Sequence, residues 1–258
     1  MMRIAVKIAY IGDNFSGSQI QPGFKTVEGE ILIDLEKICH QPPEEYGLRL
    51  ASRTDKGVNA TGNVAVFYTD FKDAPTLLRA LNAVSKNIFY RSFAIVDDSF
   101  IPRFANARTY RYIFPKKKMD VTRAKDCAAL FVGEHDFVKF CRYDGKSTVV
   151  AIDSISVTED EGIVILDFRA KYYLWNMIRR ISAAIYAVST GRSALSDIQT
   201  ALEGQDMTFG LARADALTLV DVIYDELTFE TPIDVLSQRA DDELFSIELI
   251  RAFFSSLK

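Results

Sequence analysis

Two spacings of apolar residues alternate along the chain, and this alternation restricts the fold more than any other feature of the sequence. Residues 3–10 carry Ile4, Val6 and Ile8 at every second position, which predicts a strand. Residues 26–40 carry apolar side chains at helical spacing behind Thr26, which is placed to cap a helix. The pattern continues as extended, extended, helical and extended in residues 48–52, 62–68, 74–86 and 88–96. The first 96 residues therefore predict the order β-α-β-β-α-β, a split βαβ plait.

The second half repeats this alternation. Strand spacing recurs in residues 108–114, 149–157, 163–170 and 217–224, and helical spacing in residues 122–131, 174–189 and 195–202. Polar residues 230–242 predict an irregular segment, and residues 243–257 a terminal amphipathic helix. A chain of 258 residues is long enough for two small domains. We therefore predict an α+β protein with two lobes, residues 1–104 and 105–258, and a groove between them.

The composition excludes other classes of protein. Hydrophobic residues are 48% and charged residues 26% of the chain, which is a globular mixture and excludes a disordered chain or a coiled coil. No apolar run approaches the roughly 18–20 residues of a membrane span, and the N-terminus does not resemble a signal peptide. Three widely spaced cysteines, Cys39, Cys127 and Cys141, predict free thiols in a reducing cytoplasm. His135 is expected in a loop rather than at a metal.

The net charge of −4 hides an uneven distribution. From Asp221 onward the chain carries nine acidic and three basic residues, whereas residues 103–125 carry eight basic residues and one acidic residue. A positive segment can bind phosphate oxygens even on an acidic protein, because charges beyond about 10 Å are screened. The alternative is that the basic segment is a solvated surface loop.

The segment of residues 51–60, Ala-Ser-Arg-Thr-Asp-Lys-Gly-Val-Asn-Ala, is the first candidate for chemistry. Asp55 lies between Arg53 and Lys56, and nearby cations favour the carboxylate over the acid. We therefore expect Asp55 to be ionised and nucleophilic at neutral pH. The alternative is a charged hairpin turn, in which aspartate and glycine are common for structural reasons.

The strand of residues 108–114 is the second candidate. Arg108, Tyr110 and Tyr112 share one face of this strand, because side chains two residues apart point the same way. A basic and aromatic face suits an unpaired base that stacks beside a phosphate contact. The alternative is an ordinary amphipathic strand, since tyrosine is a common strand residue.

The segment of residues 172–180 is the third candidate, because Arg179 and Arg180 interrupt an apolar helix. These arginines either extend from a buried helix to solvent or face inward and pair with an anion, for which Asp55 is one candidate. The turn at residues 10–19 has neither the glycine pattern of a dinucleotide fold nor a P-loop lysine. It therefore predicts no nucleotide cofactor.

Taken in order, these segments resemble the TruA family of tRNA pseudouridine synthases in its archaeal form. The family's opening Tyr-x-Gly, aromatic, glycine and glutamine correspond to Tyr10, Gly12, Phe15, Gly17 and Gln19. Its Arg-Thr-Asp-x-Gly-Val motif matches residues 53–58, and its Arg-x-Tyr-x-Tyr strand matches residues 108–112. Its aromatic-Leu-x-x-Met-Val-Arg helix is similar to residues 173–179, and its closing Ala-x-Ala-x-x-Leu-x-Leu to residues 212–219.

The resemblance implies the pseudouridine synthase fold, with two split βαβ (ferredoxin-like) lobes, a mostly antiparallel sheet and an RNA-binding groove. It implies an isomerase that converts uridine to pseudouridine at positions 38 to 40 of the tRNA anticodon stem-loop. The reaction needs no metal and no organic cofactor. The resemblance further implies a cytoplasmic homodimer with tRNA as its partner and no membrane association.

The resemblance also implies roles for single residues. Asp55 would be the catalytic aspartate, which either attacks the sugar C1′ or assists glycal formation. Arg179 would pair with Asp55 and orient it, and Tyr110 would stack on the target uracil and help the proton leave C5. Arg53 would hold the target nucleotide out of its stem. The substrate-binding residues would be Tyr110, Arg53, Arg108 and Lys56.

Two other functions remain open from the residues alone. A non-catalytic RNA-binding plait would use Asp55 as a turn residue, and a carboxylate-nucleophile hydrolase would need a second acid for magnesium. The sequence also departs from the usual family pattern at six positions that bear on RNA positioning. These positions are Ser18, Ser52, Lys56, Asn59, Arg213 and Asp215.

Overall fold

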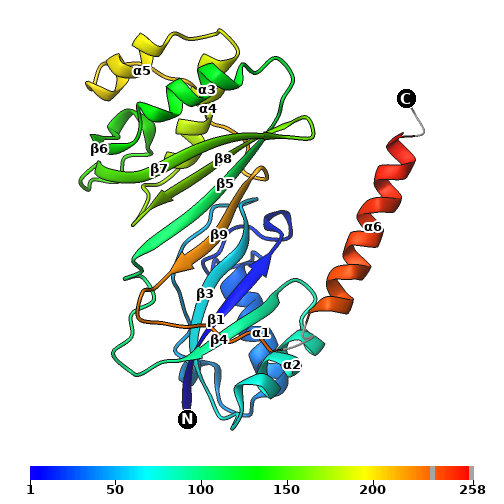
Figure 1. The fold of residues 1–258 in the computed structure, drawn as a ribbon. Helices are drawn as coiled ribbons and strands as arrows, with labels where there is room; N and C mark the ends of the chain where they lie inside the picture. The colour runs from blue at the N-terminus through cyan, green and yellow to red at the C-terminus, as the bar shows by residue number, and fades with distance from the viewer. Residues whose placement is uncertain (233–235, 256–258) are drawn as a thin grey trace.

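One nine-stranded sheet runs through the molecule in the computed structural model, which describes residues 1–232 and 236–255 (Figure 1). The strand order is β4-β1-β3-β9-β5-β8-β7-β6, and β2 pairs with β3. The β3–β9 pair is parallel, and the other pairs are antiparallel. The predicted α+β class with a mostly antiparallel sheet is therefore confirmed.

The first half has the element order that the spacing predicts. It contains β1 (Met2–Tyr10), α1 (Val27–Ile38), β2 (Arg49–Leu50), β3 (Asn59–Thr69), α2 (Ala74–Val84) and β4 (Phe89–Ile95). Thr26 caps α1 as predicted, because its Oγ1 accepts a hydrogen bond from the Gly29 amide at 3.3 Å. Pro75 lies in the first turn of α2, where its missing N–H has no helical partner to lose.

The second half differs from the prediction at two places. It contains β5 (Ala107–Pro115), α3 (Val121–Ala129), β6 (Gly133–Asp136), β7 (Val149–Asp160), β8 (Ile163–Ala170), α4 (Met177–Ser189), α5 (Leu195–Leu202) and β9 (Leu217–Ile223). His135 lies in strand β6, opposite Val150, and not in a loop. Helix α4 begins at Met177 instead of Leu174, because Asn176 has a left-handed backbone with φ of 62°.

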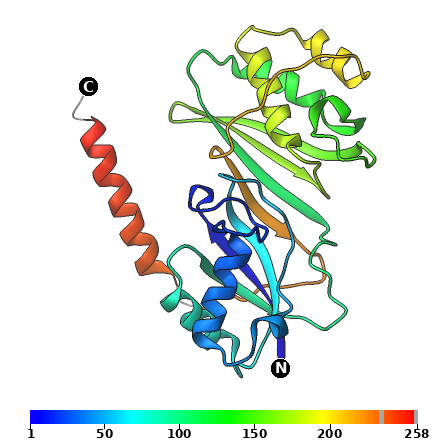
Figure 2. The same cartoon turned by 180° about the vertical axis from the view of Figure 1, so that it is seen from behind.

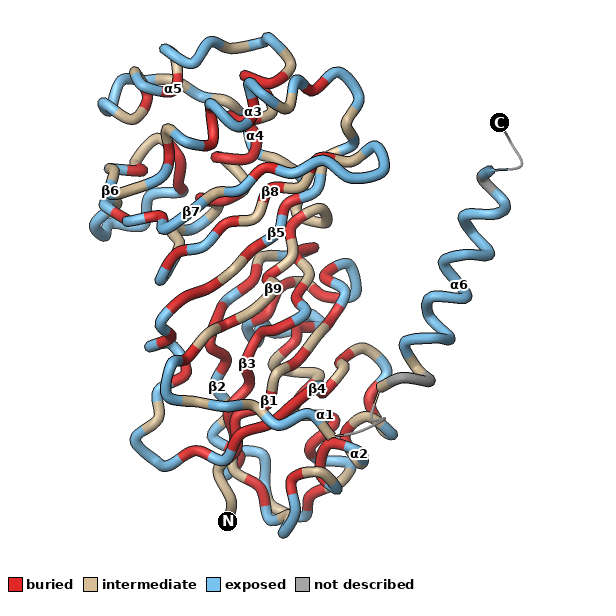
Figure 3. Tube along the Cα trace, in the orientation of Figure 1, coloured by how far each residue is buried: buried red, intermediate tan, exposed pale blue. Residues whose placement is uncertain are grey.

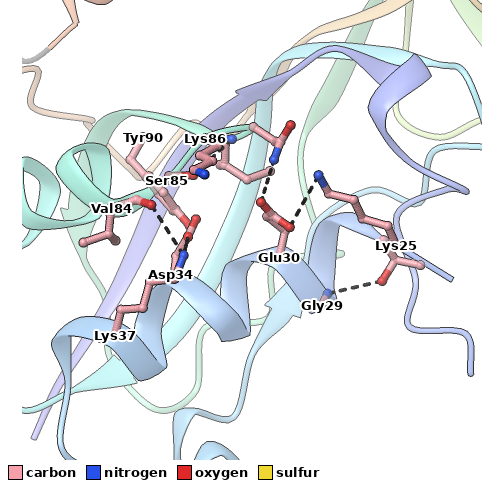
Figure 4. Close-up of polar contacts among 12 residues, drawn as sticks. Lys25, Gly29, Glu30, Asp34, Lys37, Val84, Ser85, Lys86 and Tyr90 are labelled. Atoms are coloured by element: carbon pink, nitrogen blue, oxygen red, sulfur yellow. Dashed lines mark hydrogen bonds and ion pairs between the residues drawn. The ribbon is translucent and has the colours of Figure 1, made fainter. Parts of the chain in front are cut away.

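Helices α1 and α2 lie side by side (Figure 2), and a polar cluster connects α1 to β4 (Figure 4). Asp34 on α1 is fully buried and accepts hydrogen bonds from the Tyr90 hydroxyl at 3.0 Å and Lys37 Nζ at 3.2 Å. Lys25 Nζ lies 3.8 Å from a carboxylate oxygen of Glu30 on the same helix. Because the buried carboxylate of Asp34 and the partly buried one of Glu30 both have partners, this cluster stabilises the helix layer.

Helix α6 (Ser237–Ser255) extends away from the body of the protein (Figures 1 and 3). Its start is fixed by Arg239, which donates to the Lys86 and Ile88 carbonyls at 2.8 and 3.0 Å and stacks over Phe89. The prediction of an amphipathic helix is wrong, because exposed apolar side chains surround the axis: Leu244, Phe245, Ile247, Leu249 and Ile250. The helix also begins inside the segment expected to be irregular, and the expected end at Leu257 lies outside the described residues.

Within the described ranges, the structure has no helix long and apolar enough to cross a membrane.

Candidate active site

A cavity of about 960 Å³ lies between the two halves of the chain and takes side chains from both. The first half contributes residues 16–19 and the segment from Leu48 to Lys56. The second half contributes the start of β5, residues 141–144 and the turn before α4. All six residues that the sequence nominates line this cavity: Arg53, Asp55, Lys56, Arg108, Tyr110 and Arg179.

The backbone that carries Asp55 is fixed by the early glycine-containing turn. Ser18 Oγ accepts a hydrogen bond from the Thr54 amide at 2.9 Å, and the Ser18 amide donates to the Thr54 carbonyl at 3.1 Å. A Cβ atom at Gly12 would lie 2.4 Å from the Val58 carbonyl oxygen, so the two backbones are in direct contact. Gly57 has a φ of 82°, which disfavours any other residue there. The two glycines therefore allow the early turn and the segment after Asp55 to lie in direct contact, and this contact positions Asp55.

Two further contacts hold the same segment. The Tyr10 hydroxyl and Thr54 Oγ1 are hydrogen-bonded at 2.8 Å in the buried interior. Asn59 Oδ1 accepts from the Gly12 amide at 2.8 Å, and Asn59 Nδ2 donates to the Asp215 carbonyl at 2.8 Å. Asn59 thus connects the Asp55 segment to the early turn and to the residues that lead into β9.

Asp55 faces Arg179 across the cavity. The Arg179 Nη1 atom lies 3.9 Å from Asp55 Oδ2, and the two side chains are 16% and 37% exposed. The guanidinium is held in place by two contacts: Nε donates to the Ala212 carbonyl at 2.8 Å, and Nη1 to Asn176 Oδ1 at 3.3 Å. The arginine is therefore fixed before a ligand binds, and the carboxylate stays accessible from the cavity.

Burial raises the pKa of Asp55 above its ordinary value. The Arg179 guanidinium opposes this rise most strongly, followed by a side-chain hydrogen bond from Trp175 and the charge of Arg142. The expectation that the neighbours Arg53 and Lys56 keep Asp55 charged is thus wrong about the cations involved. The charges that act on the Asp55 carboxyl come instead from Arg179 and Arg142, which the fold brings to the cavity from distant parts of the chain.

Tyr110 lines the same cavity as Asp55 and is almost fully buried. Its ring meets the Tyr173 ring edge to face, with centroids 5.3 Å apart. Burial raises the pKa of Tyr110, and the nearby Tyr10 and Asp55 contribute in the same direction. The phenol is therefore protonated at neutral pH, which suits a hydrogen-bond donor rather than a general base.

The Arg108 side chain forms its hydrogen bonds with groups of its own chain. The residue is only 8% exposed. Its guanidinium donates to Ser52 Oγ at 2.8 Å and to the carbonyls of Ala51, Arg103 and Lys171 at 3.0, 3.0 and 2.5 Å. With most of its N–H groups engaged in this way, the geometry favours a positioning role over a contact with a ligand phosphate.

The basic segment 103–125 does not form one surface at the cavity. Arg103 and Arg108 line the cavity. Arg111 is instead paired with Asp167 on β8 at 2.7 Å, and Lys116 with Glu159 on β7. Of the eight basic residues in this segment, Arg103 and Arg108 are the two placed at the cavity, and phosphate binding by the segment stays a prediction.

Comparison with known proteins identifies the family. The family model described as tRNA pseudouridine synthase matches residues 127–225. The tRNA pseudouridine synthase A of Pyrococcus abyssi is 37% identical over 98% of this chain and 97% of its own length. Its counterpart from Archaeoglobus fulgidus is 33% identical over 99% of this chain and 97% of its own length. The chain belongs to the tRNA pseudouridine synthase A family. This confirms the family that the ordered motifs indicate.

Other matches to this chain include the tRNA pseudouridine synthase A of Pyrococcus horikoshii, which is 38% identical over 88% of this chain and 87% of its own length. Among solved structures, an archaeal box H/ACA sRNP Nop10–Cbf5 complex matches 71% of this chain and 43% of that chain, with 10% identity and a TM-score of 0.35.

Sequence reasoning assigned no role to Trp175 or Arg142, both of which lie in this site. Trp175 occupies one of the two unspecified positions of the aromatic-Leu-x-x-Met motif and is the single tryptophan of the chain. Being the single tryptophan was the one sequence feature that could have indicated a role for this residue. Arg142 belongs to none of the motifs, and its place next to Trp175 depends on the fold of the segment before β7.

Proposed function

We propose that the protein isomerises uridine to pseudouridine at positions 38 to 40 of the tRNA anticodon stem-loop, with Asp55 as the nucleophile and no cofactor. The observation that carries this proposal is the fixed Arg179 guanidinium opposite Asp55 in a cavity lined by aromatic and basic side chains. Family membership supports the reaction class.

The reaction balances without a redox partner. The bond between N1 of uracil and C1′ of the sugar breaks, a bond between C5 and C1′ forms, C5 loses a proton and N1 gains one. Asp55 either attacks C1′ or assists glycal formation, and in both cases its ionised form is needed. Arg179 would hold that carboxylate in place, and Tyr110 would pack against the uracil ring.

Tritium release from tRNA labelled at uracil C5 tests the proposal, because forming the new bond expels the C5 hydrogen. We expect release by the wild-type protein, a partial loss when uridine 38, 39 or 40 is replaced by cytidine, and no release when all three are replaced. Persistent release from the triple replacement would contradict the positions. Binding without release from any tRNA would favour the RNA-binding alternative, and a catalytic requirement for magnesium would favour the hydrolase.

The acid limb of the pH–rate profile should report the raised pKa of Asp55. Activity falls as the carboxylate is protonated, so kcat/KM should decline with falling pH at a midpoint above 3.8, the ordinary value. Arg179→Gln removes the cation that most lowers this pKa, so the midpoint should move to higher pH. Tritium release measured across the pH range decides this, and a midpoint unchanged from wild type would contradict the assignment.

Arg53 and Arg108 should respond differently to salt. A side chain that binds a phosphate contributes about 0.7–0.9 to the slope of log Kd against log salt concentration. We expect Arg53→Met to reduce the slope by about that amount, since Arg53 is exposed in the cavity. Arg108→Met should leave the slope unchanged and lower the free energy of unfolding by about 3 kcal/mol, because its carbonyl partners lose a charged donor. Filter binding measures the salt slopes, and urea unfolding measures the free energies. Equal slopes for the two variants would contradict the different roles given to Arg53 and Arg108.

We also infer that the chain is organised as two ferredoxin-like lobes, residues 1–104 and 105–258. The strand order supports this. In the first half β4, β1 and β3 are neighbours with β2 beyond β3, and in the second half β9, β5, β8 and β7 are neighbours. Both sets follow the fourth-first-third-second order of a split βαβ unit. The β3–β9 pair would then join the lobes into one sheet.

We propose that the protein is a cytoplasmic homodimer and that α6 makes the contact with the second copy. The exposed apolar side chains of α6 form a surface that normally has a packing partner, and the helix is about 28 Å long at 1.5 Å per residue. In an antiparallel pair, the acidic start of one α6, with Asp241, Asp242 and Glu243, would lie beside Arg251 near the end of the other. Charge complementarity therefore supports a second copy as the occupant.

Substitution on α6 tests the dimer. We expect Leu249→Glu to convert a dimer into a monomer at micromolar concentration, because it buries a charge in the apolar contact. Ser246→Glu adds the same charge at a polar position of the same helix and should weaken the dimer less. Light scattering coupled to size-exclusion chromatography gives the mass of each. A wild-type protein that is monomeric, or a Leu249→Glu variant that stays dimeric, would contradict the proposal.

A further inference from the structure

Trp175 and Arg142 form a stacked pair in the wall of the cavity. The Arg142 guanidinium carbon lies 3.9 Å from the centroid of the Trp175 ring, and the Arg142 amide donates to the Trp175 carbonyl at 2.8 Å. Both residues line the cavity that holds Asp55. The isomerisation step described above gives neither Trp175 nor Arg142 a role, so this pair needs a separate explanation.

The pair is open to the cavity and fixed in place. Trp175 is 45% exposed, which is unusual for the largest apolar side chain, and it lines the same cavity as Asp55, where it helps to lower the pKa of that carboxyl. The left-handed Asn176 backbone follows immediately and holds the turn before α4. Two more exposed tyrosines, Tyr143 and Tyr172, line the same part of the cavity.

A half-exposed indole next to the target site could provide a contact that base flipping makes necessary. A uridine that leaves the stack to reach Asp55 exposes the face of the neighbouring base. A tryptophan ring can cover that face, and an arginine beside it can bind the adjoining phosphate. Aromatic rings interleaved with cations are the usual arrangement for unpaired nucleotides.

We infer that Trp175 and Arg142 form a subsite for the nucleotide next to the target uridine, in which the indole stacks on its base and the guanidinium binds its phosphate. This inference rests on the proposed function, because it names how that same site holds its RNA. Trp175 would then connect recognition of the neighbouring nucleotide to the carboxylate of Asp55.

The single tryptophan makes the subsite directly observable. Fluorescence of Trp175 is recorded while an anticodon stem-loop RNA is added to the Asp55→Asn variant, which holds the complex without turnover. We expect quenching that follows binding. RNAs with an abasic residue on either side of the target uridine are the comparison: one of them should quench less and bind about tenfold more weakly. Equal quenching by all three RNAs would overturn the inference.

Substitutions in the protein provide a second test of the subsite. Trp175→Leu should raise KM for tritium release about tenfold, and the abasic RNA should then bind no worse than the intact RNA, since the two changes remove one interaction. Arg142→Ala should raise KM and reduce the salt slope by about one. Arg192→Ala is the matched control, because Arg192 also stacks on a ring, Tyr186, at 4.7 Å, but lies outside the cavity lining.

The two proposals fail in distinguishable ways. If the wild-type protein releases tritium while Trp175→Leu keeps the wild-type KM and the same penalty for the abasic RNA, the subsite is wrong and the isomerase proposal stands. If the wild-type protein releases no tritium, the proposed function fails, and loss of quenching with the abasic RNA alone decides whether Trp175 contacts the neighbouring nucleotide.

Discussion

Asp55→Asn should abolish tritium release from labelled tRNA while tRNA binding stays near the wild-type level. The amide keeps the size of the side chain but removes both the charge and the nucleophile. Loss of a nucleophile lowers turnover by at least about 10⁴-fold in enzymes that depend on it. The fold should survive, because Asp55 is 37% exposed and its ion pair with Arg179 spans 3.9 Å.

The matched control is Asp144→Asn, which changes another acid in the lining of the same cavity. Asp144 lies 3.6 Å from Lys146 and has no place in the proposed chemistry, so its loss should leave turnover within a few-fold of wild type. Asp55→Asn turnover within tenfold of wild type would remove Asp55 from the nucleophile role. Equal losses in both variants would indicate a general effect of cavity charge.

The elements of the fold could be predicted from the sequence because apolar spacing is a local property. The β1 strand, the Thr26 cap of α1 and the Pro75 start of α2 all depend on residues within a few positions of one another. The start of α4 could not be predicted in this way, because the left-handed backbone of Asn176 interrupts an apolar pattern that reads as continuous helix. The amphipathic character predicted for α6 failed for a different reason: apolar and charged side chains are mixed around the helix axis instead of lying on separate faces.

The candidate site, like the fold, could be predicted from the sequence only in part. Asp55 could be found from its motif, but the cations that act on its pKa, Arg179 and Arg142, come from segments more than 80 residues away. The residue type also does not reveal which groups accept the hydrogen bonds of an arginine side chain. Arg108 and Arg179 both resemble ligand-binding arginines in sequence, yet Arg108 is surrounded by carbonyls of its own chain.

Gly12→Ala should reduce turnover about 100-fold, although residue 12 does not line the cavity. The new Cβ atom would lie 2.4 Å from both the Gly57 carbonyl carbon and the Val58 carbonyl oxygen, distances that real Cβ atoms do not show. Both contacts are with backbone, so the segment after Asp55 must move. A shift of about 1 Å at a reacting group costs on the order of 10²-fold in rate.

Stability should fall less than activity. Overpacking of this kind costs about 1–3 kcal/mol, which lowers Tm by several degrees in a chain of this size. Ile11→Ala is the control, because Ile11 is the neighbouring residue and is exposed, so its truncation touches the same turn without moving the Asp55 segment. Thermal unfolding by circular dichroism and tritium release are measured for both variants. If Gly12→Ala retains turnover within a factor of two of Ile11→Ala, the early turn does not set the position of Asp55, and the close approach of the two backbones serves packing alone.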